Sequence, residues 1–160
     1  MCGLLSRPVV TRPAAEPLDL VLPGVTSSVP LARQRFRDFI APLPLAEEER
    51  AQVALLFGEA VTNAVQHGSP RAASDQIRIA CRLDAGEILI AIADDGPGFD
   101  PASVGAAGEV GLAGVPDLTA TSGRGIFLMR ACGGVSYEFP DRGTVCLLTY
   151  RLSDPEGEKV

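Results

Sequence analysis

The sequence predicts an α+β fold in which a mostly antiparallel sheet forms one layer and helices cover one of its faces. Two observations carry this prediction. Apolar residues recur at helical spacing over 31–40 and 46–68. The residue pattern typical of β-strands occurs over 18–22, 76–83, 87–93, 135–139 and 143–152. The predicted order is strand, two helices, two strands, lid, helix and two strands, which favours a two-layer α+β sandwich.

The first strand and the first helix are expected near the N-terminus. Residues 1–17 contain several prolines and little periodicity, so we expect a flexible tail there. The apolar alternation at 18–22 predicts a strand, and a Pro-Gly pair would end it. Ser27 or Ser28 is expected to cap the following helix through its hydroxyl group. Pro30 suits the first turn of that helix.

The second helix, predicted over 46–68, is the longest periodic segment of the chain. The glutamates at its start suit the positive end of a helix dipole, and Gly68 suits its C-terminal end. Two strands follow, at 76–83 and 87–93. The segment Asp84-Ala85-Gly86 between them predicts a hairpin turn.

The C-terminal half is expected to contain a lid, a short helix and a second hairpin. From the segment Asp94–Pro101 to Ser122 the chain is rich in glycine and alanine, and a loop of about twenty residues inside a compact domain is usually functional. A short helix is predicted over 126–132. The last hairpin would join the strands at 135–139 and 143–152.

One domain, over residues 18–152, is expected between the N-terminal tail and a charged tail at 153–160. The chain of 160 residues is long enough for a single core. With 46% apolar and 21% charged residues, and no apolar run long enough to cross a bilayer, it predicts a cytoplasmic protein without membrane contact. The net charge of −6 argues against a broad nucleic-acid-binding surface.

The four cysteines and the single histidine indicate neither a disulfide framework nor a structural zinc site. No two cysteines form a CxxC pair, and one histidine adds little to a ligand set. We therefore expect reduced thiols that fill space in the core.

Three polar residues form a column along the second predicted helix. Glu59, Asn63 and His67 are four residues apart, and residues at this spacing are neighbours on a helix surface. On a helical wheel the column lies at the edge of the apolar face, where a cleft would open. The apolar face itself consists of Val53, Leu56, Phe57, Ala60, Val61, Ala64 and Val65.

The Glu59 and Asn63 pair suggests phosphate chemistry assisted by a metal ion. The amide oxygen of Asn63 is a hard ligand that suits Mg²⁺. The carboxylate of Glu59, one turn earlier, could deprotonate a hydroxyl group that approaches a phosphate. The alternative is a solvated edge of a core helix. His67 is interpreted as a structural residue.

A second polar motif, Asp94-x-Gly96-x-Gly98, follows a strand that is expected to be buried. Asp94 could accept a hydrogen bond from an exocyclic amine, and the glycines would let the backbone approach a flat ligand. The alternative is an ordinary turn, since Asp, Pro and Gly are common turn residues.

A third motif, Gly123-Arg124-Gly125, would begin the short helix after the lid. Free N–H groups at a helix N-terminus attract anions, and Arg124 could add a contact to phosphate. Gly143-Thr144, at the start of the last strand, has little meaning alone. Each motif is weak evidence by itself.

The order of these motifs resembles the GHKL superfamily, whose ATP-binding domain has the Bergerat fold. Residues 58–68 are similar to the N box of anti-sigma-factor serine/threonine kinases of the RsbW and SpoIIAB type. Residues 94–101 resemble the G1 box, and residues 123–129 resemble the G2 box. The resemblance covers about residues 18–152.

The resemblance implies a role for each matching residue. Glu59 corresponds to the general base that acts on the protein substrate, and Asn63 corresponds to the Mg²⁺ ligand. Asp94 corresponds to the residue that binds the adenine amino group. Phosphate contacts would come from the glycines at the lid boundary, with Arg124 as the cation for the γ-phosphate. The expected nucleotide-binding residues are Asn63, Asp94, Gly96, Gly98, Gly123, Arg124, Gly125 and Thr144.

Kinases of this family bind a sigma factor and phosphorylate a small antagonist with a STAS domain, so the resemblance implies these partners, together with ATP and Mg²⁺. Family members often dimerise, which leaves a homodimer open. Two alternatives remain. The first is a module that binds ATP and sequesters a partner without phosphorylating it. Such a module would have no use for the carboxylate of Glu59. The second is a histidine-kinase-like domain that acts on a histidine in another chain.

Overall fold

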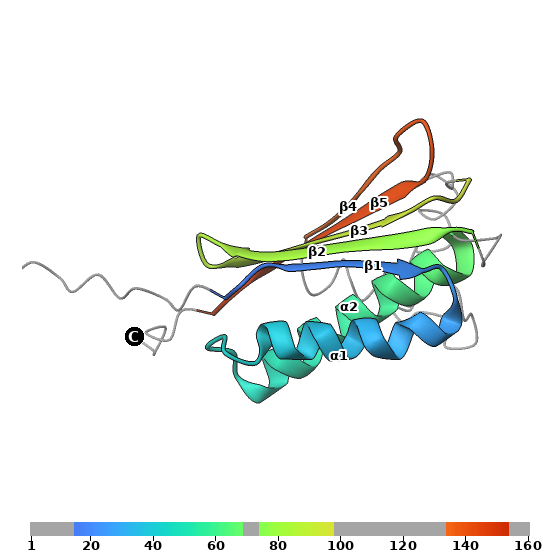
Figure 1. Ribbon diagram of the computed structural model, residues 1–160. Helices are drawn as coiled ribbons and strands as arrows, with labels where there is room; N and C mark the ends of the chain where they lie inside the picture. The colour runs from blue at the N-terminus through green and yellow to red at the C-terminus, as the bar shows by residue number, and fades with distance from the viewer. Residues whose placement is uncertain (1–14, 69–73, 98–133, 154–160) are drawn as a thin grey trace, which may run out of the picture.

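The computed structural model has two layers, a five-stranded sheet and a pair of helices that cover one of its faces (Figure 1). It describes residues 15–68, 74–97 and 134–153. All neighbouring strands are antiparallel, in the order β1-β2-β3-β5-β4. The prediction of an α+β sandwich with a mostly antiparallel sheet is therefore confirmed.

The strands form two hairpins and one added edge. Their bounds are β1 Leu18–Pro23, β2 Gln76–Asp84, β3 Glu87–Asp94, β4 Gly134–Glu138 and β5 Thr144–Arg151. The turn between β2 and β3 consists of Ala85 and Gly86, both with positive φ (46° and 84°). A two-residue turn with positive φ at both positions matches the right-handed twist of the flanking strands, so the predicted hairpin is confirmed.

The first helix begins in a different way from the prediction. A 3₁₀ turn, η1 (Thr26–Ser28), leads directly into α1 (Val29–Ile40), and α2 spans Glu47–Gly68. Ser28 stands at the N-terminal boundary of α1 but makes no side-chain capping hydrogen bond. Its backbone is already helical, at φ −78° and ψ −22°, so its hydroxyl group is not placed as a cap requires. The expectation of a serine cap was wrong.

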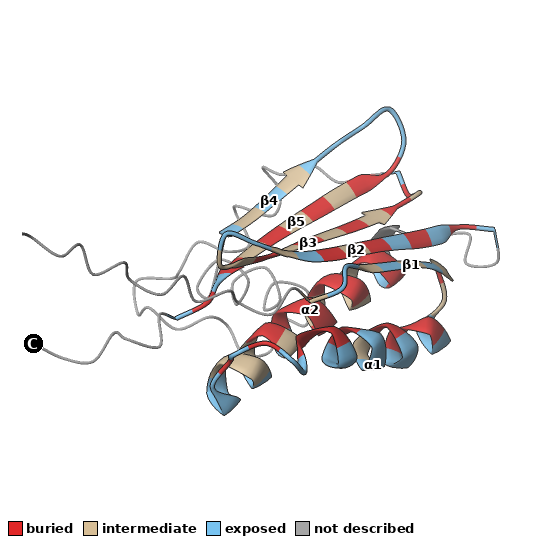
Figure 2. Cartoon of the chain, turned by 60° about the vertical axis from the view of Figure 1, so that its left-hand side comes forward, coloured by how far each residue is buried: buried red, intermediate tan, exposed pale blue. Residues whose placement is uncertain are grey.

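The core lies between the helices and the inner face of the sheet. Strand residues alternate between buried and more exposed positions, and each helix turns a buried stripe toward the sheet (Figure 2). Phe36 of α1 and Phe57 of α2 stack with ring centroids 4.0 Å apart, which joins the two helices. All seven predicted core residues of α2 are buried. The sheet contributes Ile77, Ile79, Cys81, Ile88, Ile90, Ile92, Cys146, Leu148 and Tyr150.

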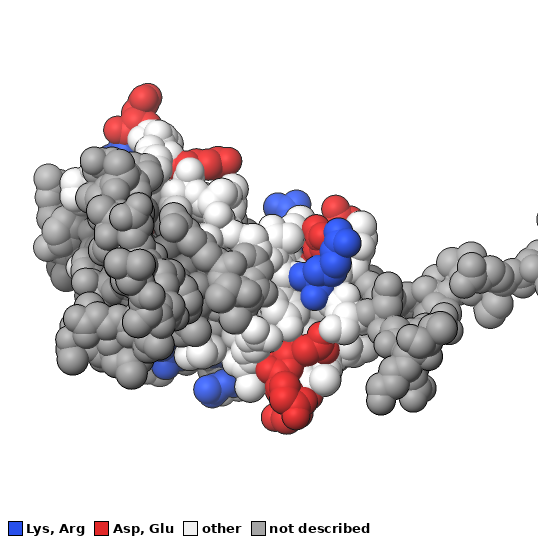
Figure 3. Space-filling view, turned by 180° about the vertical axis from the view of Figure 1, so that it is seen from behind, with Lys and Arg blue, Asp and Glu red and all other residues white. Residues whose placement is uncertain are grey.

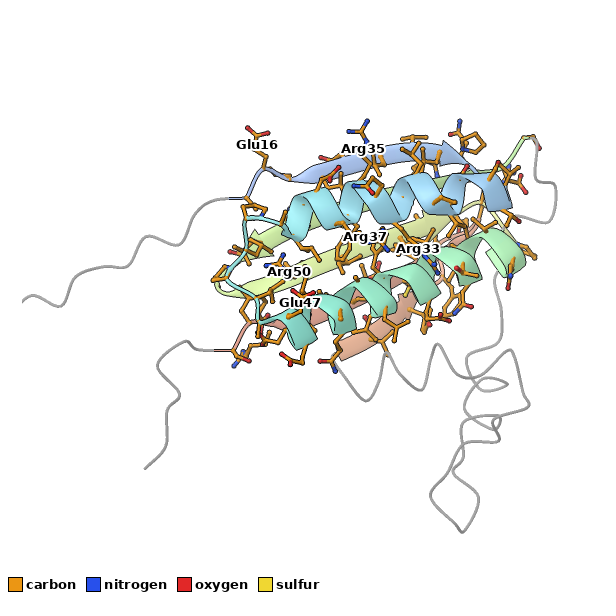
Figure 4. All side chains as sticks on the ribbon, turned by 90° about the horizontal axis from the view of Figure 1, so that it is seen from below. Glu16, Arg33, Arg35, Arg37, Glu47 and Arg50 are labelled. Carbon is orange, nitrogen blue, oxygen red and sulfur yellow. The ribbon has the colours of Figure 1, made fainter. Side chains whose placement is uncertain are left out.

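Arg50 fastens the connection between the two helices. Its Nη1 donates to the carbonyl oxygen of Ile40 at 2.6 Å, and its Nη2 donates to that of Leu43 at 3.1 Å. Each of these carbonyl oxygens also accepts a backbone N–H, that of Leu43 for Ile40 and that of Leu45 for Leu43, so the guanidinium group adds a charged donor to both. In Figure 4, Arg50 lies where the end of α1 meets the start of α2.

Charged side chains are dispersed over the described surface. On the face shown in Figure 3, basic and acidic side chains of the described residues stand in small separate groups. Two ion pairs join neighbouring parts of the sheet, Arg78 with Asp95 at 3.0 Å and Arg151 with Glu87 at 2.7 Å. Within the described ranges, no helix is long and apolar enough to span a membrane.

Candidate functional site

The candidate site begins where β3 ends and β5 starts. Asp94 is the last residue of β3, Thr144 is the first residue of β5, and the two residues are paired across the sheet. The C-terminal end of α2 lies at this same end of the sheet (Figure 1). Helix α2 packs against both β3 and β5. The fold therefore brings the polar half of α2 toward two strand ends that are 50 residues apart in the sequence.

The Asp94 carboxyl group is held by backbone donors. The N–H of Gly96 donates to Oδ1 of Asp94 at 2.9 Å, and the N–H of Thr144 also donates to this carboxyl group. Asp94 is only 8% exposed and Thr144 only 5%. Burial raises the pKa of Asp94, and the two backbone hydrogen bonds oppose that rise because they stabilise the charged form.

The neighbouring Asp95 has the opposite environment. It forms an ion pair with Arg78 and accepts a hydrogen bond from the N–H of Gln76 at 3.3 Å. The hydrogen bond from Arg78 is the main reason why the pKa of Asp95 is lowered. Asp95 is thus committed to its neighbours in the sheet, and Asp94 is the carboxylate that fits recognition of a ligand.

The structure describes the burial of two residues of the polar column on α2, Glu59 and Asn63. Glu59 and Asn63 both have intermediate exposure, between the buried face of α2 and its exposed face. Within the described part of the chain, neither side chain makes a hydrogen bond. His67 falls inside α2, but its side chain lies outside what the structure describes. Glu59 and Asn63 thus lie at the edge of the core, one helical turn apart.

Gly58, just before Glu59, packs against Arg33 of α1. A Cβ atom at Gly58 would lie 2.8 Å from Nε of Arg33. That Nε is buried and has no hydrogen-bond partner among the residues that the structure describes. Figure 4 shows Arg33 between α1 and α2. Arg33 is half-buried and thus differs from Arg35 and Arg37 on the same helix, which are exposed.

The described part of the site offers a metal ion few protein ligands. Among the residues that the structure describes, no group of three or more His, Cys, Asp or Glu side chains is placed to hold a metal ion. The amide oxygen of Asn63 fits Mg²⁺, which retains several waters and commonly shares its coordination with substrate phosphates. The donor set therefore fits a metal ion that arrives with a phosphate-bearing ligand.

Four of the predicted site residues lie outside the described residues: Gly98, Gly123, Arg124 and Gly125. The predicted lid and the predicted helix at 126–132 also lie outside them. Gly96, by contrast, is buried beside Asp94.

Sequence reasoning missed Asp75 and gave Gly143 no role of its own. Asp75, just before β2, is 3% exposed, and its charge contributes to the raised pKa of Asp94. Gly143 has a φ of 91° and donates its N–H to the carbonyl oxygen of Gly96 at 3.1 Å. Only the glycine itself signalled this position, since the pairing of β3 with β5 has no local sequence signal.

Comparison with known proteins gives a family match over most of the chain. The histidine kinase-like ATPase domain matches residues 22–148. An anti-sigma F factor of Shouchella clausii (strain KSM-K16) is 31% identical over 85 residues, which are 53% of this chain and 58% of that protein. An anti-sigma F factor of Oceanobacillus iheyensis is 29% identical over 140 residues, 85% of this chain and 92% of that protein. The chain thus spans less than two thirds of the Shouchella protein.

Solved structures share the fold. The RsbU and RsbW domains of Rv1364c from Mycobacterium tuberculosis match with a TM-score of 0.60 and 22% identity, over 88% of this chain and 33% of that chain. The catalytic domain of the histidine kinase ThkA matches with a TM-score of 0.51 and 13% identity, over 86% of this chain and 96% of that domain. At these identities the structural matches establish the common fold alone.

Proposed function

Because this chain belongs to the family of histidine kinase-like ATPase domains, within the GHKL superfamily, we propose that it is an ATP-dependent protein serine/threonine kinase that acts as an anti-sigma regulatory factor. The observation that carries the kinase function is Glu59, a half-buried carboxylate one helical turn before Asn63. The similarity to two anti-sigma F factors supports the regulatory role.

Asp94 and Thr144 would recognise the adenine base. The Asp94 carboxylate has two oxygens with about four acceptor positions. The N–H groups of Gly96 and Thr144 use two of them. The remaining capacity suits an exocyclic amine, and the limited exposure of both residues would strengthen the contact by excluding water.

Gly98, Gly123, Arg124 and Gly125, which lie outside the described residues, would contact the phosphates. Asn63 would hold a Mg²⁺ ion, which neutralises phosphate charge in reactions of this class. Glu59 would accept the proton of a substrate serine or threonine hydroxyl group. The hydroxyl oxygen forms a bond to the γ-phosphorus, the bond from the γ-phosphorus to the β–γ bridging oxygen breaks, and ADP leaves.

The partners would be a sigma factor and an antagonist with a STAS domain, which would be the phosphorylated protein. We also propose that the chain can form a homodimer and that its single domain spans residues 18–152. The competing function is sequestration of a partner without phosphoryl transfer. Sequestration needs the nucleotide-binding residues but does not require the carboxylate of Glu59.

The test is transfer of labelled phosphate from γ-labelled ATP to STAS-domain proteins of the same genome, in the presence of Mg²⁺. The wild type should label one antagonist, and Glu59→Gln should lose transfer by at least about 100-fold while it still binds ATP. Glu48→Gln is the matched control, because Glu48 is exposed in the first turn of the same helix.

Two outcomes would overturn the kinase function. If the wild type binds ATP but labels no candidate, the protein sequesters its partner without transfer. If the label sits on histidine, shown by loss of the phosphate in acid, the protein acts as a histidine-kinase-like domain in trans.

A further inference from the structure

Gly143 lies directly against the backbone of Asp94. A Cβ atom on this residue would lie 1.9 Å from the carbonyl oxygen of Asp94 and 3.1 Å from its carbonyl carbon. Its φ of 91° is also in the region that side chains with L configuration rarely adopt. Two independent reasons, space and backbone conformation, therefore require glycine at this position.

The approach determines where β5 begins relative to Asp94. Gly143 donates its N–H to the carbonyl oxygen of Gly96 at 3.1 Å, which ties the start of β5 to the turn after β3. The next N–H along the chain, that of Thr144, reaches the Asp94 carboxyl group. The N–H of Gly96 reaches the same carboxyl group at 2.9 Å. Both donors that orient this carboxyl group are thus fixed through Gly143.

We propose that Gly143 is a positioning residue for nucleobase recognition, which orients the Asp94 carboxylate toward an exocyclic amine of the base. This inference rests on the proposed function, because it requires Asp94 to bind adenine. A displaced β5 would remove the Thr144 donor and let the carboxylate rotate. The protein would then lose its preference for a base with an amino group before it lost its affinity for phosphates.

The experiment measures the affinity of the purified protein for ATP and for inosine triphosphate, which has an oxo group in place of the amino group. We expect the wild type to bind ATP about 10- to 100-fold more tightly, as one hydrogen bond to a charged group predicts. Gly143→Ala should bring the ratio of the two affinities to within about threefold of 1, chiefly by weakening the binding of ATP. A loss of the fold alone would lower the affinity for both nucleotides together.

Gly134→Ala is the matched control. It makes the same substitution at the start of β4, where a Cβ atom would meet Cβ of Thr149 at an ordinary 3.7 Å and nothing closer in the described part of the chain. This variant should keep the wild-type ratio. Circular dichroism and a thermal melt establish which variants are folded.

A second variant serves if Gly143→Ala does not fold. Ligation of a synthetic segment 132–160 at Cys132 allows an ester to replace the amide between Gly143 and Thr144. The ester lacks the Thr144 N–H and leaves glycine in place, and it should also lower the ratio. If the wild type prefers ATP and these variants keep the full preference, the role of Gly143 is refuted and the proposed function stands. A wild type without preference would refute adenine recognition by Asp94 itself.

Discussion

Asp94 and Asp95 differ in what surrounds their carboxyl groups. Successive residues at the end of a strand point to opposite faces of a sheet. Asp94 therefore joins the buried inner face, where burial raises its pKa, whereas Asp95 pairs with Arg78 and its pKa is lowered. The choice of Asp94 could be predicted from the alternation of the strand. Its contact with Thr144 could not, because it depends on the pairing of β3 with a distant strand.

The positions of Glu59 and Asn63 could be predicted from helical periodicity. Their place at the edge of the buried face follows from the 3.6-residue period, and the structure confirms it. The packing of Gly58 against Arg33 was beyond prediction, because it depends on how closely α1 approaches α2.

A residue-scale prediction concerns Asn63. Asn63→Ala should remove the increase in ATP affinity that Mg²⁺ produces, a loss of roughly 10- to 100-fold when Mg²⁺ is present. Affinity in EDTA should stay near the wild-type value. Isothermal titration with ATP, in Mg²⁺ and in EDTA, measures both values.

The matched control for this prediction is Gln66→Ala, an exposed amide on the same helix. This variant should retain the full effect of Mg²⁺. An Asn63→Ala protein that still responds to Mg²⁺ as the wild type does would show that the metal ion has another ligand.

At the scale of elements, two contacts hold the helix layer together. The stacked rings of Phe36 and Phe57 join the middle of α1 to α2, and Arg50 joins their ends. Helix positions could be predicted from apolar periodicity, since burial of one large apolar side chain contributes about 1.5–3 kcal/mol. The way α1 starts could not, because a 3₁₀ turn and a serine cap suit the same residues.

An element-scale prediction concerns Arg50. Arg50→Ala should lower the free energy of unfolding by about 1.5–3 kcal/mol, because it leaves carbonyl groups of Ile40 and Leu43 without their charged donor. Denaturation in urea, followed by circular dichroism, measures the change. ATP affinity should not change, since Arg50 lies at the opposite end of α2 from Asn63.

Arg35→Ala, at an exposed position of α1, is the control for stability and should change it by less than about 0.5 kcal/mol. Equal stability of the Arg50→Ala protein and the wild type would mean that water replaces the guanidinium group at no cost.

At the scale of the whole molecule, the sheet order decides where function lies. Neighbouring strands along the chain form the β2–β3 and β4–β5 hairpins, which the sequence predicted from turn residues. The insertion of β5 beside β3 brings Thr144 to Asp94 and completes the polar end of the sheet. The opposite end holds the Ala85–Gly86 turn and the α1–α2 connection, where the described residues show structural contacts of Arg50 instead.

The central claim is that a nucleotide binds at the end of the sheet where Asp94, Thr144 and the C-terminal half of α2 meet. Hydrogen–deuterium exchange of the protein with and without Mg-ATP tests it most directly. We predict slower exchange at 59–68, 94–97 and 143–145, and unchanged exchange at 84–87 and 40–50. Slower exchange confined to 84–87 and 40–50, or no change anywhere at saturating Mg-ATP, would contradict the claim.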